Sequence, residues 1–140
     1  MRAAAGRRYQ QLIRQGRVRV ELRTADEIGE ADATLDVVLA VNNVHTWPDP
    51  RAGFTELHRV LRPGGLLLSA HQKWLLGAEA ALTAAVKGAG FTEIKVWSWE
   101  QPGRKAPTAV QLRARPTSPL TIAHASQADR HVAPMRLGPR

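Results

Sequence analysis

The sequence predicts an α/β fold, in which strands and helices alternate along the chain and the strands form one open sheet. Two apolar runs, at 37–41 and 66–70, are too short for helices and are typical of strands buried in a parallel sheet. Between them, residues 49–61 repeat apolar side chains at three- and four-residue spacings, the period of a packed helix. This alternation, with short connections, predicts a sheet covered by helices on both faces.

The first 34 residues contain two further predicted elements. Strong helix formers from Arg2 to Gln15 predict a helix that ends at Gly16. Residues Val18–Leu22 then alternate apolar and charged side chains, which predicts a strand with one covered face. The polar and acidic residues 23–34 are expected to form a connection.

The helix that follows the first buried strand has clear end signals. Asp49 and Pro50 predict its start, because an aspartate side chain caps free amides and proline fits the first turn. Residues 62–65, with the sequence Arg-Pro-Gly-Gly, predict the turn that ends it. Within this helix, Glu56 and Arg59 are three residues apart and are expected to form a solvated ion pair.

The C-terminal half predicts one more helix and two strands. The helix is alanine-rich, from Ala78 to Lys87, and the strands are Phe91–Ser98 and Val110–Arg113, separated by a loop at 102–107. Since no helix joins these two strands, they are expected to form an antiparallel hairpin. Residues 116–140 are rich in proline and polar side chains without an apolar period, which predicts a disordered tail.

Composition limits the classes of protein that need to be considered. The chain has 140 residues and is 44% hydrophobic, enough for one domain, which we place at 1–115. It has no cysteine, which excludes disulfides, a thiolate nucleophile and a cysteine-based zinc site, and its histidines lack metal-ligand spacing. It has no apolar run of about 20 residues and no secretory signal, so we expect a cytoplasmic protein without a membrane span.

The net charge of +8 is concentrated at the two ends of the chain. Residues 1–23 hold seven arginines against one glutamate, and residues 101–140 hold seven basic residues against one aspartate. The middle of the chain, 24–100, has ten acidic and six basic residues. An acidic centre with basic ends that lack interleaved aromatic residues is not typical of a nucleic-acid platform, so no specific nucleic-acid binding is expected.

Polar side chains gather after the predicted strands. In an open α/β sheet, ligands lie beyond the carboxyl ends of the strands, which here are followed by residues 23–26, 42–49 and 71–74. The middle loop is the richest, because it places two amides, an imidazole and an indole directly after a buried strand.

Two longer motifs surround this loop. Residues 36–50 read D-V-V-L-A-V-N-N-V-H-T-W-P-D-P, and residues 56–65 read E-L-H-R-V-L-R-P-G-G. Joined at this spacing, they resemble the small-molecule branch of the class I S-adenosylmethionine-dependent methyltransferases, and the resemblance extends over residues 1–113. It implies a Rossmann-like sheet of strand order 3-2-1-4-5-7-6 with a terminal antiparallel hairpin. It also implies methyl transfer from S-adenosylmethionine to a small molecule.

The resemblance assigns the cofactor side of the site. Thr24 and Ala25 match the family's adenine-contacting turn, in which an acidic residue usually precedes the alanine, and Asp26 is a possible substitute for that acid. Asn42, with Asn43 beside it, matches the strand end next to the methionine portion of the cofactor. The alternative for Asn42 is an amide that only caps the turn from strand to loop.

The resemblance also assigns the acceptor side. His45 and Trp47 match its positions in the loop, and His71 follows the next strand toward the same opening. A histidine can act as a general base for an oxygen or nitrogen nucleophile, because its pKa lies near working pH. The alternative for each of these residues is packing within the loop.

The family's acidic-G-x-G-x-G loop and its first two strands have no counterpart in this sequence. We therefore expect an incomplete, N-terminally truncated sheet formed by the last four strands, with the first helix and strand docked loosely or paired directly against it. Three hypotheses remain open: an enzyme whose start lies further upstream, a non-catalytic remnant or partner-completed binding module, and a basic nucleic-acid binder. The sequence decides neither the methyl acceptor nor the oligomeric state.

Overall fold

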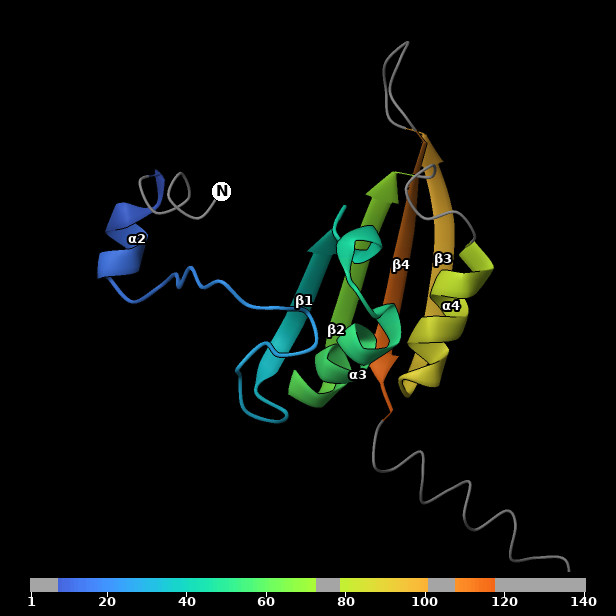
Figure 1. Ribbon diagram of the computed structural model, residues 1–140, viewed down its shortest axis with the longest axis horizontal. Helices are drawn as coiled ribbons and strands as arrows, with labels where there is room; N and C mark the ends of the chain where they lie inside the picture. Colours follow the sequence, from blue (N-terminus) through green and yellow to red (C-terminus); the bar gives the residue numbers. More distant parts are fainter. Residues whose placement is uncertain (1–7, 73–78, 101–107, 118–140) are drawn as a thin grey trace, which may run out of the picture.

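A computed structural model describes residues 8–72, 79–100 and 108–117 of the chain. Its centre is one sheet of four strands in the order β1-β2-β4-β3 (Figure 1). β1 pairs in parallel with β2, and β4 lies antiparallel between β2 and β3. The strands are β1 (Leu35–Val41), β2 (Leu61–Gln72), β3 (Phe91–Glu100) and β4 (Thr108–Pro116). The order equals the 4-5-7-6 part expected for an incomplete methyltransferase sheet, and the C-terminal hairpin is confirmed.

Two helices connect the strands where the sequence predicts them. Helix α3 (Pro50–Val60) begins at Asp49, whose Oδ1 accepts hydrogen bonds from the backbone N–H groups of Arg51 and Ala52 at 2.8 and 3.2 Å. Helix α4 (Glu79–Gly88) precedes β3. No helix in the described part of the chain is long and apolar enough to span a membrane.

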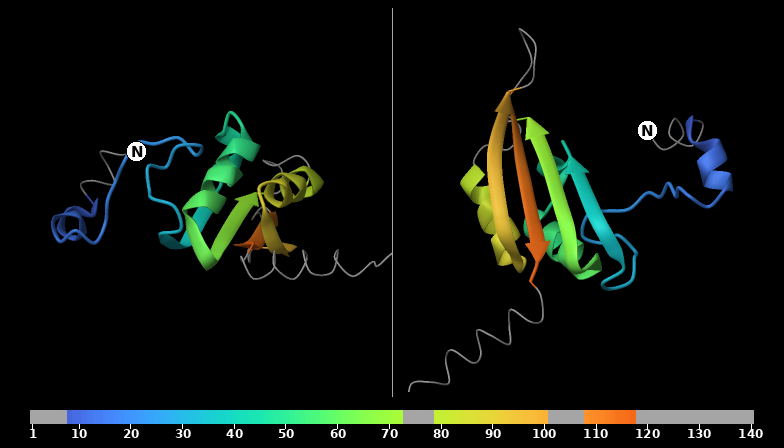
Figure 2. Two further views of the ribbon diagram at one scale, coloured as in Figure 1. Left: turned by 90° about the horizontal axis from the view of Figure 1, so that it is seen from below. Right: turned by 180° about the vertical axis from the view of Figure 1, so that it is seen from behind.

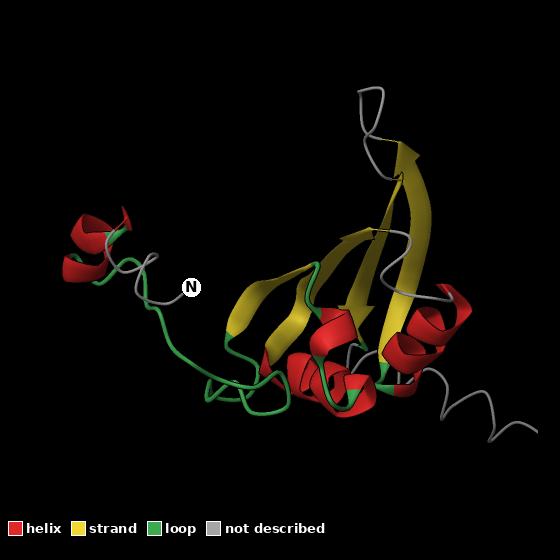
Figure 3. Cartoon of the chain, turned by 45° about the horizontal axis from the view of Figure 1, so that its top comes forward, coloured by secondary structure: helices red, strands yellow, loops and turns green. Residues whose placement is uncertain are grey.

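Both helices cover the same face of the sheet, so the prediction of helices on both faces is wrong for these strands (Figures 2 and 3). The chain moves in one direction across the sheet, from β1 to β2 and then to the parallel strand β3. Right-handed crossovers that move in one direction place their helices on one side. The core therefore lies between the sheet and the two helices, around Phe54, Leu67, Val86 and Leu112.

The opposite face of the sheet is uncovered in the described structure. It carries apolar side chains that alternate with the buried ones, and three of them on β1 and two on β3 are 43–66% exposed. The five side chains are Val37, Leu39, Val41, Trp97 and Trp99. We call this surface the open face.

The predicted strand Val18–Leu22 does not form, which corrects the sequence prediction. Among the described residues the segment has no assigned secondary structure and pairs with no strand, and the nearest isolated bridge joins Thr24 to Glu27. The pattern alone cannot make a strand, because each backbone N–H and C=O needs a partner. The preceding helix is short, α2 (Gln10–Arg14), and stands away from the sheet (Figure 1). The part of the predicted helix before residue 8 lies outside the described residues.

The turn predicted at 62–65 lies inside β2 as an irregularity. Leu61 pairs with Leu35, whereas Leu66 pairs with Val37, so the register shifts across the glycine pair. Gly64 supplies the positive φ of 78° that this shift requires. At the other end of the fold, the backbone N–H of Thr117, just after β4, bonds to the carbonyl of Gly90 at 3.3 Å. The predicted loop at 102–107 and the tail from 118 lie outside the described residues.

Candidate functional site

The loop after β1 opens at the carboxyl edge of the sheet, as predicted. Asn42 fixes this position, because its N–H bonds to the carbonyl of Ala70 at 2.9 Å and its Oδ1 accepts from the N–H of Gln72 at 3.0 Å. Asn42 also has a positive φ of 49°, a conformation that asparagine tolerates better than most residues. The side-chain oxygen of Asn42 thus ties the ends of two parallel strands together, as the capping alternative predicts.

A single helical turn, η1 (Val44–Thr46), carries the loop toward helix α3. The Asn43 carbonyl accepts from both the N–H and the hydroxyl of Thr46, at 2.9 and 2.6 Å. Val44 is buried, whereas His45 is exposed. The turn therefore anchors on Val44 and presents His45 outward.

Trp47 ends this loop as a packed side chain. Its ring meets Phe54 edge to face, with centroids 5.2 Å apart. The ring also lies so close to Gly53 that a Cβ there would stand 2.5 Å from Trp47 Cε3, and 3.3 Å from Ala25 Cβ. The glycine in the middle of α3 thus makes room for the indole. The sequence analysis missed Gly53, although a glycine inside a helical pattern is a signal for a close approach.

A cavity of about 290 Å³ lies between the turn at residues 24–27 and the end of β1. Four of the predicted site residues line it together: Thr24, Ala25, Asn43 and Trp47. Trp47, predicted on the acceptor side, thus lines the same cavity as residues predicted on the cofactor side. Asp26 and Asn42 are exposed and are not part of this lining. We call this space the turn cavity.

A second cavity, of about 160 Å³, lies between α3 and α4 below His45. Its walls are almost wholly apolar, and its lining consists of Val44, His45, Pro50, Phe54, Ala81, Leu82 and Ala85. Trp47 lines the first cavity and Phe54 the second, so their ring contact separates the two spaces. We call this second space the histidine cavity.

His71 lies deeper than predicted. It is 1% exposed near the end of β2, on the face that the helices cover. Its Nε2 shares a hydrogen bond with the Ser69 hydroxyl, while its Nδ1 is buried and has no partner among the described residues. Burial lowers the pKa of His71, and the neighbouring His45 lowers it further. His71 is therefore a neutral, buried imidazole beneath the loop.

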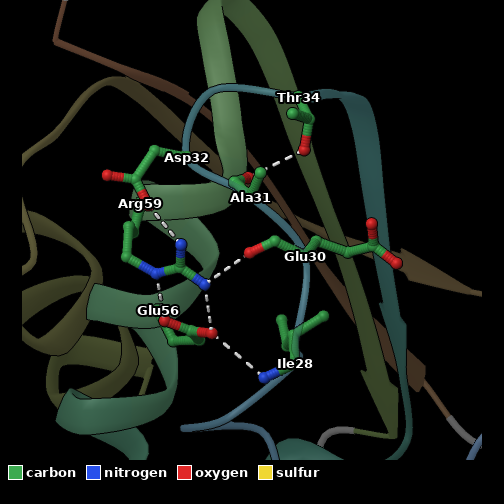
Figure 4. Close-up of polar contacts among 7 residues, drawn as sticks. All are labelled: Ile28, Glu30, Ala31, Asp32, Thr34, Glu56 and Arg59. Carbon is green, nitrogen blue, oxygen red and sulfur yellow. Dashed lines mark hydrogen bonds and ion pairs between the residues drawn. The ribbon is translucent and has the colours of Figure 1, made fainter.

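Helix α3 holds the segment that leads into β1 (Figure 4). The Ile28 N–H donates to Glu56 Oε1 at 3.0 Å, and Arg59 donates to Glu56 and to the Glu30 carbonyl at 2.6 to 2.8 Å. Arg59 also forms an ion pair with Asp32. The prediction of a solvated Glu56–Arg59 pair is thus wrong, because the Glu56 side chain is 12% exposed and joins a network.

This network perturbs the ionisation of Glu56. The hydrogen bond from Arg59 is the main cause that holds the pKa of Glu56 below its usual value, against the opposing effect of burial. Arg59, hydrogen-bonded to two carboxylates, has a raised pKa. The charged pair secures residues 28–32 on α3 and so helps to place the turn at 24–27 beside Trp47.

Comparisons with known proteins agree with this geometry. Residues 1–69 match the family model described as a methyltransferase domain, whereas no curated protein matches the chain in sequence. A Thermotoga maritima structure described as a possible histamine N-methyltransferase is 21% identical, with a TM-score of 0.60, over 79% of this chain and 69% of its own. The YcgJ protein from Bacillus subtilis is 12% identical, with a TM-score of 0.67, over 84% and 79%.

A third structure holds a putative methyltransferase in complex with the Haloferax volcanii activator Trm112. It is 16% identical with a TM-score of 0.54 and covers 69% of this chain and 61% of its own. The chain thus spans 61–69% of the length of the first structures that it matches.

The fold is that of the class I S-adenosylmethionine-dependent methyltransferases. Residues 1–69, just under half of the chain, match the methyltransferase domain family, and a solved structure of this fold is described as an S-adenosylmethionine-dependent methyltransferase.

The turn cavity fits only part of that cofactor. Its volume is at the lower end of the roughly 300–1,000 Å³ usual for ligand sites. It offers the Thr24 hydroxyl, the Asn43 amide and the Trp47 ring, which suit a flat heteroaromatic group. No carboxylate is among its described lining residues to accept from ribose hydroxyls or an ammonium group, and the Asn42 amide oxygen is already bonded to Gln72. The residues present do not fit the whole cofactor.

Proposed function

We propose that the protein transfers a methyl group from S-adenosylmethionine to a small molecule, and that this chain holds the acceptor and the adenine end of the cofactor. One observation carries the proposal: the loop at 42–49 stands at the carboxyl edge of two parallel strands, with a separate cavity on either side of the Trp47–Phe54 contact. Two adjoining spaces suit a reaction of two partners. A small-molecule acceptor and a cytoplasmic location are parts of this proposal.

Each cavity has a role in the proposal. Ala25, Asn43 and Trp47 hold the adenine ring in the turn cavity, and the acceptor enters the histidine cavity. The apolar walls of the histidine cavity favour an acceptor with an apolar body and exclude water from its reacting atom. His45 removes the proton from the acceptor's oxygen or nitrogen, with its neutral form as the base. When bound, the cofactor supplies an electrophilic methyl group.

The test is calorimetric titration of the full chain with S-adenosylmethionine and with S-adenosylhomocysteine. We expect weak binding, through the adenine end of the ligand alone, that is lost in Thr24→Arg, because Thr24 is exposed and a long side chain there fills the turn cavity. Thr55→Arg, an equal change at an exposed position of α3 that lines neither cavity, is the matched control and is expected to bind normally. A heat of binding that is unchanged in Thr24→Arg would contradict the placement of the adenine ring in the turn cavity.

A second candidate function is a non-catalytic remnant or a partner-completed binding module. The absence of a carboxylate from the described lining of the turn cavity favours it. It predicts no heat with either ligand from a chain that still unfolds cooperatively. One solved structure of similar fold, described as the [4+2]-cyclase SpnF, has 16% identity and a TM-score of 0.63. The cyclase activity in that protein's description is an example of other chemistry on this fold.

A further inference from the structure

The histidine cavity continues into a second hollow between the same two helices. Helices α3 and α4 lie side by side on one face of the sheet (Figures 2 and 3). The second hollow has a volume of about 560 Å³, and its lining consists of Asp49, Pro50, Arg51, Ala81, Ala84 and Ala85. Pro50, Ala81 and Ala85 also line the histidine cavity, so the two spaces adjoin. We call the second hollow the outer groove.

The inner of the two spaces has the size of one aromatic ring. The histidine cavity has a volume of about 160 Å³, and an engineered apolar cavity of about 150 Å³ holds one benzene molecule. Its walls include the Phe54 ring and the aliphatic side chains of Val44 and Leu82, which contact a flat apolar group favourably. Among its described lining residues, only His45 has a polar side chain. A ring with a single hydroxyl therefore matches this cavity in size and in polarity.

The outer groove, in contrast, carries charge. Asp49 and Arg51 are both exposed on its α3 side. The Asp49 carboxylate caps α3, because its Oδ1 accepts hydrogen bonds from the backbone N–H groups of Arg51 and Ala52. The Arg51 side chain forms no ion pair with any residue that the structure describes. Its guanidinium is thus available for an anion in the groove.

The Arg51 guanidinium lies within reach of the histidine cavity. Its Nη2 would be 3.5 Å from a Cβ placed on Gly88, so it lies beside the last turn of α4. Gly88 follows Ala81 by a distance of roughly 10 Å along a helix axis, which a short flexible chain on a ring can bridge. His45 lines only the histidine cavity and Arg51 only the outer groove, so these two polar groups lie at opposite ends of the combined space.

We infer that the histidine cavity and the outer groove together bind a hydroxylated aromatic carboxylic acid with one ring and a short side chain. The ring lies in the histidine cavity with its hydroxyl at His45, and the carboxylate lies at Arg51. The inference rests on the proposed function only for the role of this molecule as the methyl acceptor. Its binding depends on the loop after β1 and on α3 and α4, which the described structure contains.

The test is calorimetric titration of the full chain, without cofactor, with three compounds that share a para-hydroxyphenyl ring. They are the propanoate, the uncharged propanamide and the ethylamine, which carry a negative, a neutral and a positive end. We expect the propanoate to bind about fivefold more tightly than the propanamide, as an exposed ion pair allows, and the ethylamine to bind most weakly. The preference for the propanoate should shrink with added salt, because salt screens the charge of Arg51.

Two pairs of variants assign the two ends of the ligand. Arg51→Gln should abolish the preference for the propanoate and leave the affinity for the propanamide unchanged. Arg17→Gln, the same change at an exposed arginine that lines neither space, should keep the preference. Ala81→Leu should weaken the binding of all three compounds, because the larger side chain narrows the histidine cavity. Ala80→Leu, the same change at the exposed neighbouring position, is its control and should bind them normally.

The outcomes separate this inference from the proposed function. Circular dichroism verifies that each variant keeps its fold. Binding of the propanoate without binding of S-adenosylmethionine supports the inference and contradicts the proposed function, whereas binding of S-adenosylmethionine without binding of the propanoate does the reverse. Equal affinities for the propanoate and the propanamide, a preference that persists in Arg51→Gln, or binding that Ala81→Leu does not weaken would also overturn the inference.

Discussion

Replacing Gly53 by alanine tests whether the Trp47 loop is locked onto helix α3. Alanine is the better helix former by about 1 kcal/mol, so propensity alone predicts a more stable protein. The added methyl group, however, would lie 2.5 and 2.8 Å from two carbons of the Trp47 ring, where ordinary contacts are about 3.5–4.0 Å. The ring must therefore move by roughly 1 Å.

We expect the steric clash with Trp47 to cost more free energy than the higher helix propensity of alanine supplies. The Trp47 ring packs against Phe54, so a shift of the ring disturbs that contact, and the added methyl group would also lie 3.3 Å from Ala25 Cβ. Overpacking of this kind costs about 1–3 kcal/mol. We expect Gly53→Ala to lower the free energy of unfolding by about 1 kcal/mol, or the melting temperature by about 4–8 °C for a domain of this size.

Urea unfolding of four proteins measures this effect: the natural sequence, Gly53→Ala, Trp47→Ala and the double variant. With the indole removed, the Gly53→Ala change should become stabilising, because only the helix propensity remains. The sign of its effect is thus expected to reverse between the two backgrounds. Stabilisation of similar size in both backgrounds would refute the proposed contact between Gly53 and Trp47.

Three further predictions concern the cap and the two perturbed groups. Asp49→Ala removes the acceptor of two backbone hydrogen bonds and is expected to lower the free energy of unfolding in urea by about 1 kcal/mol. Asp49→Asn keeps an acceptor oxygen and should retain most of that stability. The pKa of His71 is lowered from 6.5, so the unfolded chain binds the proton more readily, and stability should rise with pH through the window below 6.5 and then level off. His71→Leu should flatten melting temperatures across that window, and an unchanged slope would exclude His71 as the cause. The pKa of Glu56 is lowered from 4.5, so its contribution is complete above 4.5 and is lost as the pH falls through the lower folded value. Glu56→Gln should therefore lower the free energy of unfolding above pH 4.5 and make it depend less on pH below 4.5. The same pH dependence as in the natural sequence would argue against the Arg59 contact.

The sequence predicted correctly those helices and strands that depend on residues close together in the chain. The Asp49-Pro50 cap, the period of α3 and the apolar runs of β1 and β2 each depend on neighbouring residues, and all of them form. The failure of Val18–Leu22 has a non-local cause, because its pattern was correct for a strand but the described chain provides no partner. Strand pairing joins distant residues, so it cannot be read from alternation alone.

The candidate site shows the same division. The sequence placed the loop at the carboxyl edge of the sheet and favoured Thr24, Ala25 and Asn43, which the fold brings to one cavity. It could not show that Trp47 turns toward Gly53, or that Glu56 anchors a segment 28 residues earlier. Both contacts are tertiary. The Trp47 contact left one signal in the sequence, a glycine inside a helix, where propensity does not favour it; the Glu56 contact with Ile28 left none.

Because helices cover only one face of the sheet, tryptophan fluorescence can report on the other face. Trp97 and Trp99 are 43% and 47% exposed on the uncovered side, whereas Trp47 is packed against Phe54. The fourth tryptophan, Trp74, lies outside the described residues and is replaced by phenylalanine for this measurement. A water-soluble quencher should then extinguish the fluorescence of Trp97 and Trp99 and spare that of Trp47. Any molecule that settles over β3 would shift their emission to shorter wavelengths, so occupancy of that surface can be followed without attaching a dye.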